Sequence, residues 1–151
     1  MLEKFANDNL KQRILENSYP GRGIVLGRDI DGDWVQIYWI MGRSTNSRNR
    51  VFVLDGDLLR TQVADSTQVS DPSLIIYNAM RISGNQFIVS NGMQTDSIWH
   101  GLENNIYFTD ILREWQYEPD APNYTPRISG CIDYSQGDGL AWLSILKRSG
   151  F

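Results

Sequence analysis

The amino-acid sequence predicts an α+β fold in which antiparallel strands dominate. Short apolar segments come in pairs, and turn signals such as Asp31-Gly32-Asp33 and Asp55-Gly56-Asp57 join the two members of a pair. Two segments with helical spacing follow these hairpins, at residues 95–103 and 106–116. A last pair of strand-like segments comes after them. Hairpins, two helices and a final hairpin therefore succeed one another along the chain.

The individual elements are expected in the following order. Apolar residues near helical spacing predict an amphipathic helix over residues 2–16, and the turn formers at 19–23 end it. Strands are predicted over residues 24–27, 34–41, 51–55, 58–63, 74–82, 87–90, 127–134 and 140–147. Thr95 or Asp96 is expected to cap the helix at 95–103. Residues 117–126 contain three of the five prolines and are predicted to lack regular structure.

Length and composition limit the classes of protein. A chain of 151 residues is long enough for one domain with its own core. The net charge of -4 argues against nucleic-acid binding, which normally uses a basic face. No apolar stretch approaches the roughly 20 residues of a membrane span, and Glu3 and Asp8 stand where a signal peptide would be apolar. The single cysteine, Cys131, excludes an internal disulfide, so a cytoplasmic location is expected.

The single histidine and the single cysteine also restrict the chemistry. A zinc site needs about three or four Cys, His or acidic ligands at suitable spacing, so no metal is expected. His100 lies near the predicted end of a helix, where the helix dipole favours a positive charge without any catalytic role. Cys131 lies in the apolar run 128–132 and is expected in the core.

Arginine supplies most of the positive charge. Of the 14 basic residues, 11 are Arg, and the polar segment 42–50 contains Arg43, Arg48 and Arg50. An arginine side chain grips phosphate or carboxylate through two donors and keeps its charge. Concentrated within an acidic chain, these arginines predict a built anion site rather than a general attraction to polyanions.

Four polar clusters interrupt or end the apolar strands. They are the segment 42–50, Tyr77-Asn78 with Arg81, residues 90–96 and residues 117–127. Taken singly, each is better explained by a turn, an ion pair or a core hydrogen bond. Taken together, they predict a pocket with Arg for phosphate, amides for a polar ring, and Tyr and Glu for proton transfer. An Asn-Gly turn at a helix start would add free backbone N–H groups for an anion.

Five ordered motifs carry a family resemblance. They are Tyr-Pro-Gly-Arg-Gly at 19–23, Met-Gly-Arg-Ser-Thr-Asn-Ser-Arg-Asn-Arg at 41–50, Asp-Pro-Ser-Leu-Ile-Ile-Tyr-Asn at 71–78, Ser-Asn-Gly-Met-Gln-Thr-Asp at 90–96 and Tyr-Glu-Pro-Asp-Ala-Pro-Asn-Tyr-Thr-Pro-Arg-Ile at 117–128. With them the chain resembles the archaeal-type IMP cyclohydrolase family, including its bacterial relatives. The resemblance implies a four-layer αββα sandwich of mostly antiparallel sheets, like that of N-terminal-nucleophile hydrolases. Met1-Leu2 supplies no nucleophile of that kind.

The resemblance also implies an activity and a site. The family closes the purine ring of 5-formamidoimidazole-4-carboxamide ribonucleotide to give IMP and water, with no cofactor and no metal. By the family's motif positions, the catalytic residues would be Arg50, Tyr77 and Glu118. The substrate-binding residues would be Arg43, Ser44, Arg48, Asn49, Asn78, Arg81, Asn91, Gly92, Thr95, Asp96 and Arg127. One domain over residues 1–151 is expected, and it would be C-terminally short because bacterial relatives continue further.

The expected reaction suits these residue types. An amide nitrogen is a poor nucleophile, so orientation and proton removal must supply much of the rate. Arg50 would stabilise the charge on the formyl oxygen, while Tyr77 and Glu118 would relay protons in an order that the sequence leaves open. The expected partner is a small purine ribonucleotide, without nucleic acid or membrane, and a homo-oligomer is left open. Two alternatives remain, namely a purine-nucleotide-binding or regulatory module without turnover and an enzyme of this fold that acts on another nucleotide amide.

Overall fold

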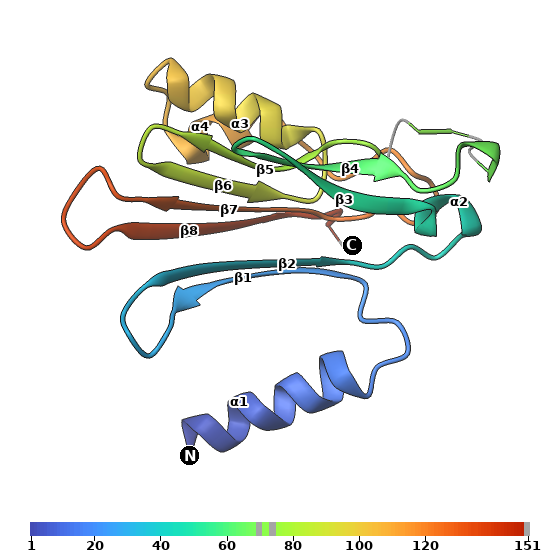
Figure 1. Ribbon diagram of the computed structural model, residues 1–151, viewed down its shortest axis with the longest axis horizontal. Helices are drawn as coiled ribbons and strands as arrows, with labels where there is room; N and C mark the ends of the chain where they lie inside the picture. The colour runs from blue at the N-terminus through green and yellow to red at the C-terminus, as the bar shows by residue number, and fades with distance from the viewer. Residues whose placement is uncertain (69–70, 73–74, 150–151) are drawn as a thin grey trace.

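The computed structural model describes residues 1–68, 71–72 and 75–149, and it confirms the α+β class (Figure 1). Two antiparallel sheets are present, one of two strands in the order β1-β2 and one of six in the order β3-β4-β5-β6-β7-β8. The strands are β1 (Arg22–Arg28), β2 (Trp34–Ile40), β3 (Arg50–Asp55), β4 (Leu58–Val63), β5 (Asn78–Ser83), β6 (Gln86–Ser90), β7 (Arg127–Asp133) and β8 (Leu140–Leu146). Neighbours in the larger sheet are also neighbours in sequence, as the turn signals predict.

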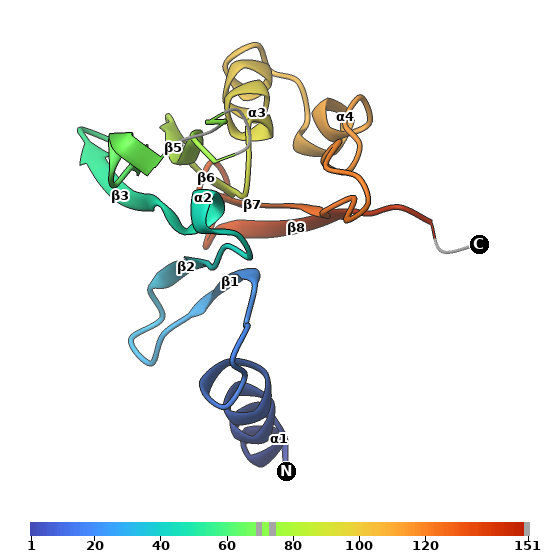
Figure 2. The same ribbon diagram turned by 90° about the vertical axis from the view of Figure 1, so that its right-hand side faces the viewer.

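The helices lie at different places around the two sheets, and the short helix at 45–48 lies at their edge (Figures 1 and 2). They are α1 (Leu2–Leu10), which continues as a short π-helix over Lys11–Leu15, then α2 (Thr45–Arg48), a 3-10 turn over Ser66–Gln68, α3 (Gln94–Glu103) and α4 (Phe108–Leu112). Helices α3 and α4 cover one face of the six-stranded sheet, and β1-β2 lies against the other face. Helix α1 lies beyond β1-β2. None of the described helices is long and apolar enough to cross a membrane.

The main core lies between the six-stranded sheet and its two helices. The helix α3 presents Ile98 and Leu102, one turn apart, to the sheet, where Ile88 of β6 lies directly opposite Cys131 of β7. Phe108 of α4 completes the same cluster. Cys131 is therefore a core residue, as predicted, and burial raises the pKa of its thiol to about 12.

Close approach of the two sheets depends on one glycine. A Cβ atom at Gly130 of β7 would lie 3.0 Å from Leu26 of β1 and 3.1 Å from Val89 of β6. The absence of a side chain there lets β1 lie against β7. A hydrogen bond of 2.7 Å from Gln36 Nε2 of β2 to the Phe87 carbonyl oxygen of β6 fixes the second strand. The two-stranded sheet is thereby held over the middle of the larger one.

Several predicted boundaries were wrong. The strand expected from residue 74 begins at Asn78, and the N–H groups of Ile75 and Ile76 instead bond to the Pro72 carbonyl oxygen in a turn. Leu74 lies outside the described residues. The residue that caps α3 is Met93, not Thr95 or Asp96, because the helix already begins at Gln94. The second helix ends at Leu112, whereas an end at 116 was expected. His100 lies in the last turn of α3, as predicted.

Replacing Ile98 by Ala should destabilise the domain by about 2–5 kcal/mol, because the side chain is fully buried and its loss leaves a cavity. Urea unfolding followed by circular dichroism measures this difference. The matched control is Leu54→Ala, since the Leu54 side chain is 72% exposed. A loss below about 0.5 kcal/mol in Ile98→Ala, the range of an ordinary surface change, would contradict this position for the core.

Candidate functional site

Two tyrosine hydroxyl groups meet where the two sheets face each other. The backbone of Tyr77, just before β5, is fixed by Thr61 of β4, whose N–H donates to the Tyr77 carbonyl oxygen at 2.9 Å. The Thr61 hydroxyl also accepts from the Tyr77 N–H at 2.9 Å. The Tyr77 side chain is buried, and its hydroxyl oxygen lies 2.6 Å from that of Tyr38 on β2. Tyr77 is thus fixed both by its own backbone and by the opposite sheet.

Glu118 reaches the same region from the proline-rich loop at 117–126. The Glu118 N–H donates to the Thr125 carbonyl oxygen at 2.8 Å, and the Asp120 carboxylate accepts from both the N–H and the hydroxyl of Thr125. These bonds give the loop a defined shape without regular structure. The Glu118 carboxylate is buried, and Arg22 Nη1 of β1 lies 2.6 Å from its Oε1. The pair is a charge-assisted hydrogen bond that joins β1 to the proline-rich loop.

Arg50, at the start of β3, is partly buried, and its two Nη atoms are shielded from solvent. Within the described structure neither Nη1 nor Nη2 has a hydrogen bond. Burial lowers the pKa of Arg50 below its usual value, and neighbouring Arg22 lowers it further, while Tyr77 and Glu118 act in the opposite direction. A buried charge normally has a partner, because leaving it unpaired costs several kcal/mol. This guanidinium is therefore suited to receive an anion or a polarised oxygen.

The local electrostatics favour a negatively charged ligand. Arg22, Arg50 and Arg127 all interact electrostatically with the single carboxylate of Glu118. Burial raises the pKa of Glu118, and Arg22 is the strongest of the groups that oppose this rise. Burial also raises the pKa of Tyr77, against the lowering effects of the Tyr38 hydrogen bond and of Arg50 and Arg22. The Asp120 carboxylate also acts on Arg127 and Glu118, so three cations face two carboxylates, and positive charge is left to be balanced.

A cavity of about 560 Å³ opens beside this cluster. Arg22, Glu118 and Asn91 contribute to its wall, together with Arg43 and Asn123. Arg43 is exposed, and its Nη1 donates to Asn123 Oδ1 at 2.8 Å. The size is that of a small-molecule site, which typically spans about 300–1,000 Å³. The wall of the cavity thus combines an exposed arginine with the Arg22–Glu118 pair, whereas Arg50 and Tyr77 adjoin that pair and are not among the described residues that line the cavity.

Some of the predicted residues in the segment 42–50 line the cavity, and others make hydrogen bonds that stabilise the local fold. Ser44 lines the cavity, but its hydroxyl also caps α2 by accepting from the Ser47 N–H at 3.1 Å. Arg48 Nε donates to the Gly42 carbonyl oxygen at 2.8 Å. The amide of Asn49 donates to the Asp65 carbonyl oxygen at 2.6 Å and accepts from the Asp65 N–H at 2.7 Å. These contacts hold the segment in the shape that presents Arg43 and Arg50.

The residues around Asn91 form a buried hydrogen-bond network. The Asn91 side chain donates to the Pro126 carbonyl oxygen at 2.9 Å and accepts from the Ile128 N–H at 2.9 Å, so it ties the start of α3 to β7. Its own N–H donates to the Ile128 carbonyl oxygen, and so is not free for an anion as the Asn-Gly turn suggested. Arg127 Nη1 donates to Gln94 Oε1 at 2.9 Å, while its Nε is buried with no partner among the described residues.

Gly92 and Thr95 have structural roles in that network. A Cβ atom at Gly92 would lie 2.7 Å from Arg127 Nη1 and 2.8 Å from Gln94 Oε1, so a side chain there would displace one or both of these groups. The Thr95 hydroxyl is fully buried and donates to the Gly92 carbonyl oxygen at 2.9 Å. In the described structure neither residue lines the cavity, and both instead belong to the network around Asn91, which does.

A second polar cluster, formed by Asn78, Arg81 and Asp96, lies apart from the cavity. Asn78 Nδ2 of β5 is 2.8 Å from Asp96 Oδ1 of α3, and Arg81 Nη1 is 2.8 Å from the same oxygen. The Arg81 guanidinium also stacks over the Trp99 ring, 3.7 Å from its centroid. In the described part of the chain, none of these three predicted substrate-binding residues lines the cavity. The structure gives them the role of joining α3 to β5.

Sequence reasoning missed two members of the cluster, Arg22 and Tyr38. Arg22 stands inside the Tyr-Pro-Gly-Arg-Gly motif at 19–23, whose conformation at Gly21 has a positive φ of 66°. That motif was a usable signal for a functional arginine. Tyr38 is the one hydroxyl-bearing residue in the apolar run 35–41, and only the facing of the two sheets shows what it contacts.

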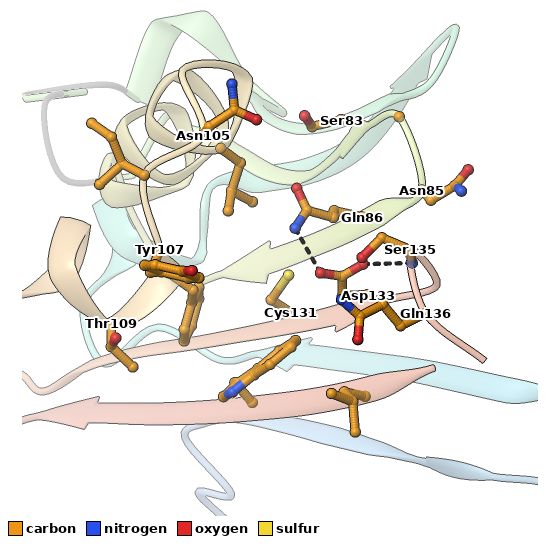
Figure 3. A pocket seen from close by; sticks show the side chains of 16 residues that line it. Ser83, Asn85, Gln86, Asn105, Tyr107, Thr109, Cys131, Asp133, Ser135 and Gln136 are labelled. Atoms are coloured by element: carbon orange, nitrogen blue, oxygen red, sulfur yellow. Dashed lines mark hydrogen bonds between the residues drawn. The ribbon is translucent and has the colours of Figure 1, made fainter. Parts of the chain in front are cut away.

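A larger cavity of about 730 Å³ lies at the opposite end of the six-stranded sheet (Figure 3). Its carboxylate, Asp133, already accepts hydrogen bonds from Gln86 Nε2 at 2.9 Å and from the Ser135 N–H at 2.7 Å. Cys131 and Tyr107 are among the other side chains that line it. None of the predicted site residues is among them. We place the site in the smaller cavity, since that cavity adjoins the buried charges.

Arg50→Met should stabilise the protein without ligand by about 1–4 kcal/mol, because an unpaired buried charge is replaced by an apolar side chain of similar length. Urea unfolding of both proteins in a buffer without phosphate or sulfate measures the change. Arg113→Met is the matched control, because the Arg113 side chain is 78% exposed, and it should change stability by less than about 0.5 kcal/mol. A clear loss of stability in Arg50→Met would show that Arg50 has a structural partner in the folded chain.

Comparisons with known proteins agree on one family. A family model described as IMP cyclohydrolase-like protein matches residues 19–151. The IMP cyclohydrolase of Methanopyrus kandleri is 30% identical over 119 residues, which cover 76% of this chain and 59% of that protein. The IMP cyclohydrolase of Haloquadratum walsbyi is 29% identical over 126 residues, covering 81% of this chain and 60% of that protein. The chain thus spans about three fifths of the length of these curated relatives.

Proposed function

Because the chain belongs to the IMP cyclohydrolase-like family, we propose that it closes the purine ring of 5-formamidoimidazole-4-carboxamide ribonucleotide to give IMP and water. The observation that best supports this proposal is the buried guanidinium of Arg50, which has no partner in the described structure and stands beside Tyr77 and Glu118. Ring closure places negative charge on a formyl oxygen, and such a site would stabilise that charge as it forms.

The proposed reaction has two steps. In the first, the carboxamide nitrogen attacks the formyl carbon, a new carbon–nitrogen bond forms, the nitrogen loses one proton and the formyl oxygen gains one. In the second, the resulting hydroxyl group leaves as water, and the other ring nitrogen loses its proton as the carbon–nitrogen double bond forms. A base, a proton donor and a stabilised oxygen are needed, and each can be assigned to a side chain of the cluster.

Glu118 is the proposed base. Arg22 Nη1 lies 2.6 Å from its Oε1, and this cation favours the ionised carboxylate although burial opposes it. Tyr77 is the proposed proton donor, because burial raises its pKa and keeps the hydroxyl protonated. Tyr38 would hold the Tyr77 hydroxyl in position through their hydrogen bond of 2.6 Å.

The nucleotide phosphate would lie at the open end of the cavity, beside Arg43. Arg43 is an exposed arginine on the cavity wall, and its guanidinium can bind two phosphate oxygens at once. Arg127 adds positive charge near Glu118. A cytoplasmic location, where purine nucleotides are at hand, is part of the same proposal. The free, buried thiol of Cys131 is consistent with it.

Tyr77→Phe should reduce the rate of IMP formation by about 10²- to 10⁴-fold, the usual scale for a positioned proton donor. The affinity for IMP should change much less, since the ring still fills its place and only the hydroxyl is lost. Formation of IMP from the formamido nucleotide is followed by absorbance, and affinity by calorimetry. Tyr107→Phe is the control, because Tyr107 is 78% exposed and lies at the other cavity.

Two outcomes of that assay would count against the proposal. If the intact protein binds the nucleotide but forms no IMP, a binding module without turnover describes it better. If Tyr77→Phe turns over at the rate of the intact protein, its hydroxyl serves the fold through Tyr38 and has no part in the reaction.

The pH dependence should report Glu118. A base acts only when ionised, so kcat/KM should fall as the pH drops through the pKa of Glu118, which burial raises above the ordinary value. Arg22 opposes that rise, so Arg22→Gln should move the acidic limb of the profile to higher pH. Arg28→Gln, on the same strand, is the control and should leave the limb in place. An unmoved limb in Arg22→Gln would mean that another group sets it.

A further inference from the structure

Arg43 is held on two sides, although its side chain is exposed. Its Nη1 donates to Asn123 Oδ1 at 2.8 Å, and the centre of its guanidinium lies 5.4 Å from the centroid of the Tyr19 ring. A cation over an aromatic face at this distance is attracted to the ring. All three residues line the cavity of about 560 Å³. An exposed arginine is otherwise free to adopt many rotamers, so these two contacts restrict where its donors point.

Asn123 comes from a loop that has a defined shape. The Asn123 N–H donates to the Asp120 carbonyl oxygen at 2.9 Å, and the Asp120 carboxylate accepts from both the N–H and the hydroxyl of Thr125. This is the loop at 117–126 that also carries Glu118. The acceptor that holds Arg43 is therefore itself held by hydrogen bonds of the loop backbone.

Tyr19 is fixed by the turn that leads into β1. Its hydroxyl donates to the Met41 carbonyl oxygen at 3.2 Å, and its N–H donates to Asn17 Oδ1 at 2.9 Å. The Met41 N–H in turn donates to the Gly21 carbonyl oxygen at 2.8 Å, which ties this turn to the start of the segment 42–50. These bonds place the aromatic ring against Arg43.

The charge on the cavity wall makes the orientation of a single arginine important. Arg22 on that wall is already paired with Glu118, and Asp71 and Asp120 add two further carboxylates. A phosphate is therefore not drawn to the wall itself by a general excess of positive charge. It needs a place where two donors point at it at once.

The guanidinium of Arg43 can provide such a place. Its bond to Asn123 engages Nη1, so the other edge, formed by Nε and Nη2, is turned away from Asn123 and has a set direction. An arginine edge of this kind holds two phosphate oxygens through two parallel N–H groups. A side chain that is ordered before binding loses less conformational entropy when the ligand arrives.

We propose that Asn123 and Tyr19 are positioning residues that hold Arg43 ready for the phosphate of a nucleoside monophosphate. The site then selects phosphorylated over unphosphorylated nucleosides, because a ligand without the phosphate gains nothing from an ordered Arg43. This inference rests on the proposed function for the position of the phosphate beside Arg43. It adds two residues that act through Arg43 and touch no reacting atom.

Calorimetry with IMP and with inosine, which is IMP without its phosphate, tests the proposal. The intact protein should bind IMP roughly tenfold or more tightly than inosine, the scale of one charge-assisted hydrogen bond. Asn123→Ala should weaken IMP binding roughly two- to tenfold, the scale of ordering one long side chain, and leave inosine binding unchanged. Asn85→Ala is the matched control, because Asn85 is also exposed and lies at the other cavity. It should change neither affinity.

A double-mutant cycle separates positioning from direct contact with the ligand. Arg43→Ala removes the group that Asn123 orients, so adding Asn123→Ala to it should cause no further loss of IMP affinity. If Asn123 binds the ligand itself, or only stabilises the loop, Asn123→Ala weakens IMP binding by the same factor with and without Arg43. That result would overturn the proposal.

Two substitutions at Tyr19 test the role of its ring. Tyr19→Leu should weaken IMP binding roughly two- to tenfold and spare inosine binding, since the stacking surface for Arg43 is lost. Tyr19→Phe should recover most of the affinity, because the ring and not the hydroxyl faces the guanidinium. Equal losses in the two variants would show that Tyr19 acts through its hydroxyl bond to Met41, against its proposed role.

These affinities are independent of turnover, so the two proposals can fail separately. A protein that forms no IMP but shows this pattern of affinities lacks the proposed activity and keeps the positioning role of Asn123 and Tyr19. Equal affinity of the intact protein for IMP and inosine overturns the positioning role, whether or not IMP is formed.

Discussion

The buried guanidinium of Arg50 is the constraint on which the rest of this site depends. A folded chain gains nothing by keeping an unpaired charge away from water, since the desolvation of an ion costs several kcal/mol. Here the charge lies at the start of β3, beside the Arg22–Glu118 ion pair and the Tyr77 hydroxyl. The arrangement makes sense if a ligand completes it. The stability that the fold forgoes in the free protein is then recovered when a negatively charged or polarised oxygen binds.

Two features of the fold hold this arrangement in place. Gly130 lets the two-stranded sheet approach the larger one, and that approach brings Arg22 and Tyr38 to the same place as Tyr77. The loop at 117–126 then brings Glu118 to Arg22 through hydrogen bonds centred on Asp120 and Thr125. Catalysis by positioned groups requires such rigidity, because proton transfer and charge stabilisation depend on distances held within a fraction of an ångström.

Much of the fold could be predicted from the sequence, because hairpin turns and apolar alternation are local signals. The Asp55-Gly56-Asp57 turn and the central position of Cys131 are examples that the structure confirms. The strand expected at 74–82 started too early, because the apolar residues 75–77 resemble a strand locally but form a turn anchored on Pro72. The spacing of apolar residues alone does not distinguish a short apolar turn from the start of a strand. The likeness to N-terminal-nucleophile hydrolases remains an expectation from resemblance.

The candidate site was harder to predict from the sequence than the fold was. Arg50, Tyr77 and Glu118 lie in polar clusters that the residue pattern indicated, but only the family's motif positions assigned them catalytic roles. Tyr38 was missed because its role depends on which residues face it across two sheets. Asn78 and Asp96 were expected to bind substrate, and the structure places them in a hydrogen bond of 2.8 Å with each other and outside the lining of the cavity. A polar residue in a strand signals that a partner exists, but the sequence does not say whether that partner is protein or ligand.

A crystal structure of the protein with bound IMP would test this account most directly. We expect the nucleotide in the cavity of about 560 Å³, with an oxygen of the purine ring within hydrogen-bond distance of an Arg50 Nη atom and the phosphate at Arg43. Binding of IMP in the larger cavity beside Asp133, or in the smaller one with Arg50 still unpaired, would contradict it.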